Sequence, residues 1–118
     1  MYTTIVSKVF PNSNIERIDE INGLSFNALD EIKSNPNCRI IAIGHDYGQF
    51  INNQYHFLIE VDNHTIRGRI CDAAKGSGYD MYCVIQDIRP LNNEYVEEQT
   101  RNIYELFNSQ NYPRHYQN

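Results

Sequence analysis

The chain has 118 residues, of which 41% are hydrophobic and 21% charged, so it has enough apolar sequence for one buried core. Its formal net charge of −5 argues against general binding of nucleic acid, although a local cluster of arginines can still hold a small anion. We expect no signal peptide, and no apolar run approaches the ~20 residues of a membrane span. Its three cysteines form no CxxC pair, so we expect a reduced, cytoplasmic protein. The chain length predicts a single domain over residues 1–118.

The first third of the chain predicts one strand and then two helices. Residues 2–10 (YTTIVSKVF) are β-branched and aromatic, a composition typical of a strand. Residues 13–16 have the spacing of a capping box, which predicts a short helix that residues 22–23 end. We expect a second helix that Ser25 caps and that ends at residues 35–36, with one apolar face formed by Phe26, Leu29 and Ile32.

The middle of the chain predicts a buried strand and a hairpin. Residues 38–43 (CRIIAI) form a short apolar run, which a loop with two glycines (GHDYG, 44–48) follows. Apolar and polar residues then alternate on both sides of Asp62-Asn63, which favours a two-residue turn. This turn predicts the pairs Val61–His64, Ile59–Ile66, Phe57–Gly68 and Tyr55–Ile70 on the core face. The other face then carries Gln54, His56, Leu58, Glu60, Thr65, Arg67, Arg69 and Cys71.

The last third predicts a long strand at residues 79–89, which Pro90 ends, and a final helix capped by Asn92 or Asn93. We expect this helix to pack through Val96, Ile103, Leu106 and Phe107, with Tyr95 and Tyr104 alongside. The order β-α-α-β-β-β-β-α predicts an α+β fold, a mainly antiparallel sheet with two or three helices packed on one face.

The segment at residues 66–80 (IRGRICDAAKGSGYD) is the densest collection of anion-binding groups in the chain. Arg67 and Arg69 point the same way, about 7 Å apart, and their forked donors suit a phosphate. Lys75 and the glycine-rich loop up to Tyr79 add a charge and backbone N–H groups, although the spacing is not that of a P-loop. The alternative for the arginines is a solvent-exposed sheet face on which they bond to Glu60 and water. The alternative for the glycine-rich loop is a simple connector between strands.

A second group of arginines and tyrosines lies toward the C-terminus, where such side chains can hold a purine by stacking and cation–π contact. Its alternative is an ordinary helix surface on which Arg101 pairs with Glu97 or Glu105. Together the two groups predict a ligand-binding site that draws on Arg67, Arg69, Lys75, Tyr79, Arg89, Asn92, Arg101 and Tyr104.

Catalytic and metal signatures are weak. His45 and Asp46, together with His56, could act as acid and base, which keeps a small phosphodiesterase as a hypothesis. The alternative for this loop is a turn in which Asp46 bonds its own backbone. His64 and Asp72 complete no recognisable metal spacing, and no GxSxG or HExxH motif occurs. We therefore expect no catalytic residues, no metal and no cofactor.

The stretches RIIAIGHDYG, QYHFLIEV, RGRICDAAKGSGYDMY and DIRP resemble the first type of Thoeris anti-defence proteins. This resemblance implies a phage-encoded sponge that binds cyclic ADP-ribose signals made by bacterial TIR enzymes and withholds them from the effector without cleaving them. Some members of that family form higher oligomers that hold cyclic oligonucleotides at a second site. We expect a small anionic nucleotide as ligand, a homo-oligomer with shared sites, and the host cytoplasm as location. The alternative is a protein-interaction inhibitor or immunity-like module that uses the acidic surface.

Overall fold

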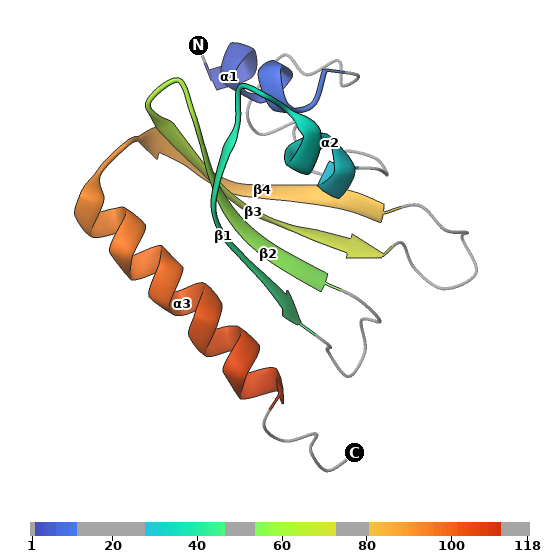
Figure 1. Ribbon diagram of the computed structural model, residues 1–118, viewed down its shortest axis with the longest axis vertical. Coiled ribbons are helices and arrows are strands. Elements are labelled where there is room, and N and C mark those ends of the chain that lie inside the picture. The colour runs from blue at the N-terminus through green and yellow to red at the C-terminus, as the bar shows by residue number, and fades with distance from the viewer. Residues whose placement is uncertain (1, 12–27, 47–53, 73–80, 112–118) are drawn as a thin grey trace.

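The computed structural model describes residues 2–11, 28–46, 54–72 and 81–111. Its centre is a four-stranded antiparallel sheet in the order β1-β2-β3-β4 (Figure 1). The elements are α1 (Tyr2–Val9), α2 (Ala28–Ser34), β1 (Arg39–Asp46), β2 (Gln54–Val61), β3 (His64–Asp72), β4 (Met81–Pro90) and α3 (Asn93–Asn111). The predicted α+β class is confirmed.

The hairpin of β2 and β3 has the predicted register, with all four predicted pairs present. Asp62 and Asn63 have φ angles of 53° and 60°, the left-handed conformation that a tight hairpin turn requires. A slip of one residue would turn Arg67 and Arg69 toward the core and Ile66 toward the polar face, so the hydrophobic pattern fixes the register.

Residues 2–9 form helix α1, so the prediction of a strand at residues 2–10 is wrong. Ile5, Val6, Val9 and Phe10 are each 3% exposed or less. Their spacing of one, three and one places them on one face of a helix, whereas a strand would divide them between its two faces. Packing of this face against the sheet outweighs the strand preference of the β-branched residues.

The remaining elements follow the predictions closely, with one extension. Helix α2 confirms the described part of the second predicted helix, and β4 ends at Pro90 as expected. Strand β1 continues beyond Ile43 to Asp46, so the first residues of the predicted GHDYG loop belong to the strand. The short helix predicted from residue 13, and most of the loops at 47–53 and 73–80, lie outside the described residues.

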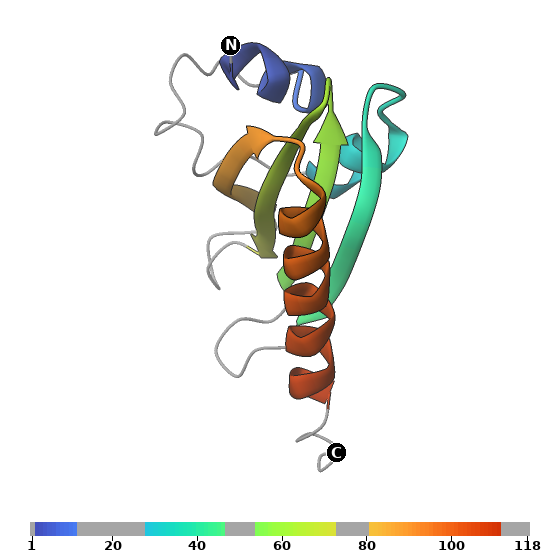
Figure 2. The ribbon, with the colours of Figure 1, turned by 90° about the vertical axis from the view of Figure 1, so that its left-hand side faces the viewer.

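The helices cover both faces of the sheet, rather than one face as the sequence predicted. Helices α1 and α2 pack on a large apolar core in which Phe57, Ile59, Ile66 and Ile70 are fully buried. Helix α3 packs on the opposite face through a smaller cluster of Ala42, Leu58 and Ile103. Leu58 is the apolar exception in the otherwise polar row that β2 presents to this face, and it gives α3 its anchor. Figure 2 shows α3 lying in front of the strands.

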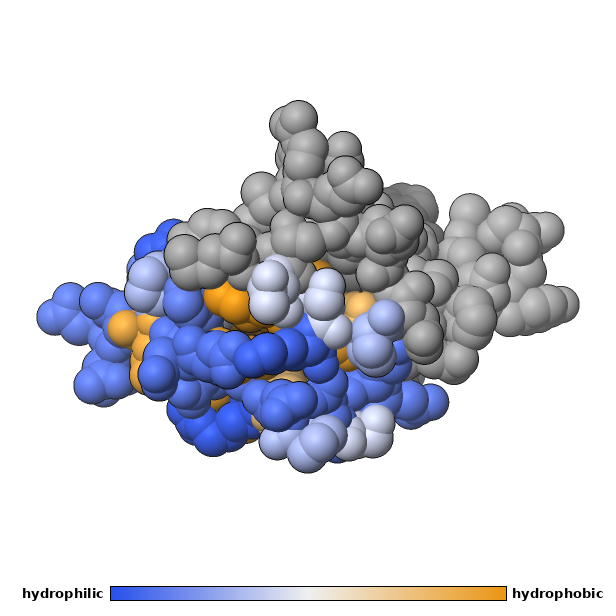
Figure 3. Space-filling view, turned by 90° about the horizontal axis from the view of Figure 1, so that it is seen from above, coloured by the Kyte–Doolittle hydropathy of each residue, from blue (hydrophilic) through white to orange (hydrophobic). Residues whose placement is uncertain are grey.

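The described surface is mainly polar. On the side seen from above in Figure 3, most of the coloured residues are hydrophilic, with small apolar areas between them. Among the described helices, none is long and apolar enough to cross a membrane. All three cysteines are free thiols, and burial raises the pKa of Cys38 to about 11.

Candidate functional site

Charged and aromatic side chains meet where β4 leads into α3. Asp87 and Arg89 lie two residues apart on β4 and so share a face. Arg89 Nε donates a hydrogen bond to Asp87 Oδ2 at 2.6 Å, and the Tyr95 hydroxyl donates to the same oxygen at 2.9 Å. The guanidinium carbon of Arg89 lies 4.0 Å from the centroid of the Tyr95 ring. Cation–π contact and two hydrogen bonds therefore hold these three side chains in one arrangement.

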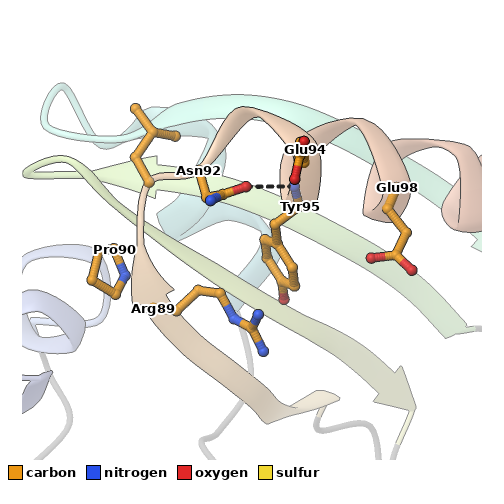
Figure 4. Close-up of a pocket in the computed structure, with 7 residues that line it drawn as sticks. Arg89, Pro90, Asn92, Glu94, Tyr95 and Glu98 are labelled. Carbon is orange, nitrogen blue, oxygen red and sulfur yellow. Dashed lines mark hydrogen bonds between the residues drawn. The ribbon is translucent and has the colours of Figure 1, made fainter.

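The turn between β4 and α3 positions Tyr95. Asn92 Oδ1 accepts a hydrogen bond from the backbone N–H of Tyr95 at 2.9 Å, which makes Asn92 the N-cap of α3 (Figure 4). The backbone N–H of Leu91 donates to the carbonyl of Asn63 at 2.8 Å and ties this turn to the tip of the hairpin. Tyr95 consequently lies in the first turn of α3, over Arg89.

An open pocket of about 500 Å³ adjoins this cluster. Its lining combines one guanidinium, one carboxamide, one phenol and two carboxylates with two apolar side chains, from Arg89, Pro90, Leu91, Asn92, Glu94, Tyr95 and Glu98. The side chain of Arg89 is 49% exposed, so a ligand in solution can reach it. The mixture of charges suits a ligand that carries both an anionic group and hydrogen-bond donors.

Arg67 adds a second positive charge on the neighbouring strand. It is the cross-strand partner of Asp87 on β4. Its Nε donates to Gln99 Oε1 at 3.1 Å, and its Nη1 donates to the carbonyl of Gly68 at 2.9 Å. These partners are neutral, and burial lowers the pKa of Arg67. Arg67 and Arg89 face one carboxylate, that of Asp87, so this β3–β4 cluster has one positive charge in excess.

Tyr95 is a hydrogen-bond donor here rather than an acid or base. Burial raises the pKa of Tyr95 to about 12, and the hydrogen bond to Asp87 and its negative charge act in the same direction. The positive charges of Arg89 and Arg67 oppose this shift without cancelling it. Tyr95 is therefore neutral at pH 7.

The structure brings together three of the predicted ligand-binding residues, Arg67, Arg89 and Asn92. Arg69 shares the face of Arg67, but its Nη1 donates to Gln54 Oε1 at 2.6 Å, toward the other end of the hairpin. Arg101 and Tyr104 are exposed on α3, near the buried Ile103, and neither lines the pocket. Lys75 and Tyr79 lie outside the described residues.

The predicted acid–base group is divided between the two faces of the sheet. His45 pairs with Tyr55, and their rings stack with centroids 4.4 Å apart, on the side of the large core. His56 is the next residue along β2 and is directed to the face that carries α3. Asp46 is the last residue of β1, and the loop that follows it lies outside the described residues. Within the described residues, no group of three or more potential ligands could hold a metal ion.

Sequence reasoning missed half of this cluster. It named neither Asp87 nor Gln99, and it counted Tyr95 among the packing residues of the last helix. A usable signal was present, because Asp87 and Arg89 share a strand face and Tyr95 stands three residues after the capping Asn92.

Comparisons of the chain with models of protein families, with curated proteins and with solved structures find no match.

Proposed function

We propose that this protein binds a phosphate-containing nucleotide signal and sequesters it without cleavage. The observation that carries the proposal is the half-exposed Arg89, which stacks on Tyr95 at the wall of an open pocket of about 500 Å³. Two positive charges support an anionic ligand beside the two carboxylates of the pocket, because Arg89 lines the pocket and Arg67 lies on the neighbouring strand.

The arrangement of Arg89 suits a phosphate. Only its Nε is bonded to another described residue, so both terminal nitrogens remain available as a fork for two phosphate oxygens. Asp87 and Tyr95 hold the guanidinium in place before a ligand arrives, which reduces the conformational entropy lost on binding. Arg67 lies on the adjacent strand and adds attraction without contacting a carboxylate.

The pocket suits a ligand of nucleotide size. Its volume of about 500 Å³ falls within the range of small-molecule sites. One face of the Arg89 guanidinium covers Tyr95, and the other can stack on a base. The Asn92 side chain uses its oxygen to cap α3, which leaves its amide N–H groups for the ligand.

Sequestration needs affinity and no acid–base pair, and the described part of the site fits this requirement. Asp87 accepts hydrogen bonds from Arg89 and Tyr95, and Tyr95 stays protonated. The resemblance described above adds further parts to this proposal. The ligand would be a cyclic ADP-ribose signal, the role anti-defence, the assembly a homo-oligomer with shared sites, and the location the host cytoplasm.

A retention experiment tests the proposal. The purified protein is incubated with ADP-ribose, cyclic ADP-ribose isomers and cyclic di- and trinucleotides, filtered, heated, and the released ligand identified by liquid chromatography with mass detection. A retained compound that returns chemically intact supports sequestration. A product of altered mass would identify an enzyme, and retention of none of these compounds would overturn the proposal in favour of a protein-interaction module.

Two arginine variants connect retention to the site. We expect Arg89→Ala to weaken binding of the retained compound by about tenfold or more in titration calorimetry, because a charge-assisted bidentate contact is lost. Arg39→Ala is the matched control, since Arg39 is an exposed arginine on β1 that pairs with Glu60 at 2.6 Å and does not line the pocket. Equal affinities for both variants and the wild type would remove Arg89 from the binding site.

A further inference from the structure

Glu98 places a negative charge in the pocket, which a site for an anion alone does not explain. It lines the same pocket as Arg89, from the second turn of α3. Tyr95 and Glu98 are three residues apart, and Figure 4 shows both side chains extending from α3 on the side where Arg89 lies. No hydrogen bond or ion pair joins Glu98 to any residue that the structure describes. A carboxylate that faces an anionic ligand weakens binding unless the ligand brings donors to it.

The other pocket carboxylate has a structural reason that Glu98 lacks. Glu94 is the acidic residue in the first turn of α3, where a negative charge stabilises the helix through its exposed N–H groups. Glu98 lies one turn further along, beyond the reach of that effect. The helix terminus therefore does not account for Glu98, which is an exposed carboxylate that lines the pocket.

We infer that Glu98 accepts hydrogen bonds from ribose hydroxyls, so that the pocket selects ribonucleotides over deoxyribonucleotides. This inference rests on the proposed function. In a nucleotide, the hydroxyls of the ribose are the donors close to the phosphate, and a carboxylate can accept from a sugar hydroxyl while Arg89 holds the phosphate. The pocket thus offers a cation for the phosphate and an acceptor for the sugar on facing walls, β4 and α3.

The test compares ribose and deoxyribose forms of the same ligand. Binding of ADP-ribose and of its 2′-deoxyadenosine analogue, and of cyclic di-AMP and its 2′-deoxy analogue, is measured by titration calorimetry for the wild type, Glu98→Ala and Glu97→Ala. Glu97 is the matched control, because it is an exposed glutamate on the same helix that does not line the pocket. Circular dichroism spectra establish that each variant is folded.

We expect the wild type to bind the ribose form of at least one pair about tenfold more tightly than the deoxyribose form. Glu98→Ala should bind the ribose form about as weakly as the deoxyribose form, whereas Glu97→Ala should retain the preference. Equal wild-type affinities for the two forms, or a tighter Glu98→Ala variant, would overturn the inference and leave the proposed function intact. If the wild type binds no member of either pair and retains no nucleotide in the filtration experiment, the proposed function fails and the inference fails with it.

Discussion

The two faces of the sheet differ in what their side chains do. On the face covered by α1 and α2, apolar residues of both helices and of the sheet form one large core, in which Phe57 is fully buried. On the face covered by α3, the described residues form a smaller apolar cluster around Leu58. The rest of that face carries Arg67, Arg69 and the Asp87–Arg89–Tyr95 cluster. We therefore expect the face under α1 and α2 to contribute more to stability, whereas the face under α3 carries the candidate site.

Strand β3 shows how one segment serves both faces. Ile66, Gly68 and Ile70 are directed to the large core, while Arg67 and Arg69 alternate with them on the opposite face. Rigid packing on one side of β3 fixes the backbone, and this backbone positions the arginines on the other side. Substitutions on the two faces should consequently have separable effects on stability and on binding.

The largest expected effect is in the core, at two adjacent residues of β2. Phe57→Ala should lower the free energy of unfolding by about 4 kcal/mol, because it removes a fully buried ring and leaves a cavity. Leu58→Ala, on the α3 face, should cost about 2–3 kcal/mol, because it removes fewer atoms from a smaller cluster. Urea unfolding followed by circular dichroism measures both values.

This pair of variants also tests the division of the faces. If Leu58→Ala destabilises the protein as much as Phe57→Ala, α3 contributes to the fold as strongly as α1 and α2, and the contrast between the faces fails. A Phe57→Ala protein too unstable to purify can be replaced by Ile59→Ala, which removes as many carbon atoms as Leu58→Ala but from the larger core, and which should therefore cost more.

A smaller effect is expected at Gly68, where the core approaches the backbone closely. A Cβ atom at this position would lie 2.6 Å from the carbonyl oxygen of Val84 and 2.7 Å from Cζ of Phe57. Neither the strand β4 nor the buried ring can move away freely, so Gly68→Ala should cost about 2 kcal/mol in the same unfolding assay. The double variant Gly68→Ala/Phe57→Leu should recover part of this loss if the ring is the obstacle, whereas additive losses would assign the strain to the backbone of β4.

The sequence predicted the face with the large core better than the face with the site. Alternation of Tyr55, Phe57 and Ile59 around a turn that accepts positive φ determined the hairpin and its register, because both signals are local. Helix α1 was missed because β-branched residues dominate its composition, although the spacing of Ile5, Val6 and Val9 indicates a helix.

The candidate site was predicted only in part because it depends on how α3 folds back over the sheet. Arg67 and Arg89 were recognisable as polar residues on strands, and Asn92 as a helix cap. Contacts such as Arg67 with Gln99 join residues 32 positions apart and depend on the placement of α3, which no local pattern specifies. The same placement, anchored by Leu58, leaves Arg101 on the outer surface of the helix.

The smallest expected effect on stability lies in the cluster itself, at Tyr95. Tyr95→Phe removes the hydrogen bond to Asp87 but keeps the ring that packs on Arg89, so the loss in the free energy of unfolding should stay below about 1 kcal/mol.

The effect of Tyr95→Phe should appear more clearly in the pH dependence of stability. Because the folded protein raises the pKa of Tyr95 from 10.0 to about 12, this residue stabilises the fold fully below about pH 10 and loses that contribution as the pH rises toward 12. An ultraviolet titration of the folded protein should therefore show a late phenolate transition that is missing in Tyr95→Phe. If the transition persists in the variant, another tyrosine is responsible, and the hydroxyl of Tyr95 does not have the fixed partner that pre-organises Arg89.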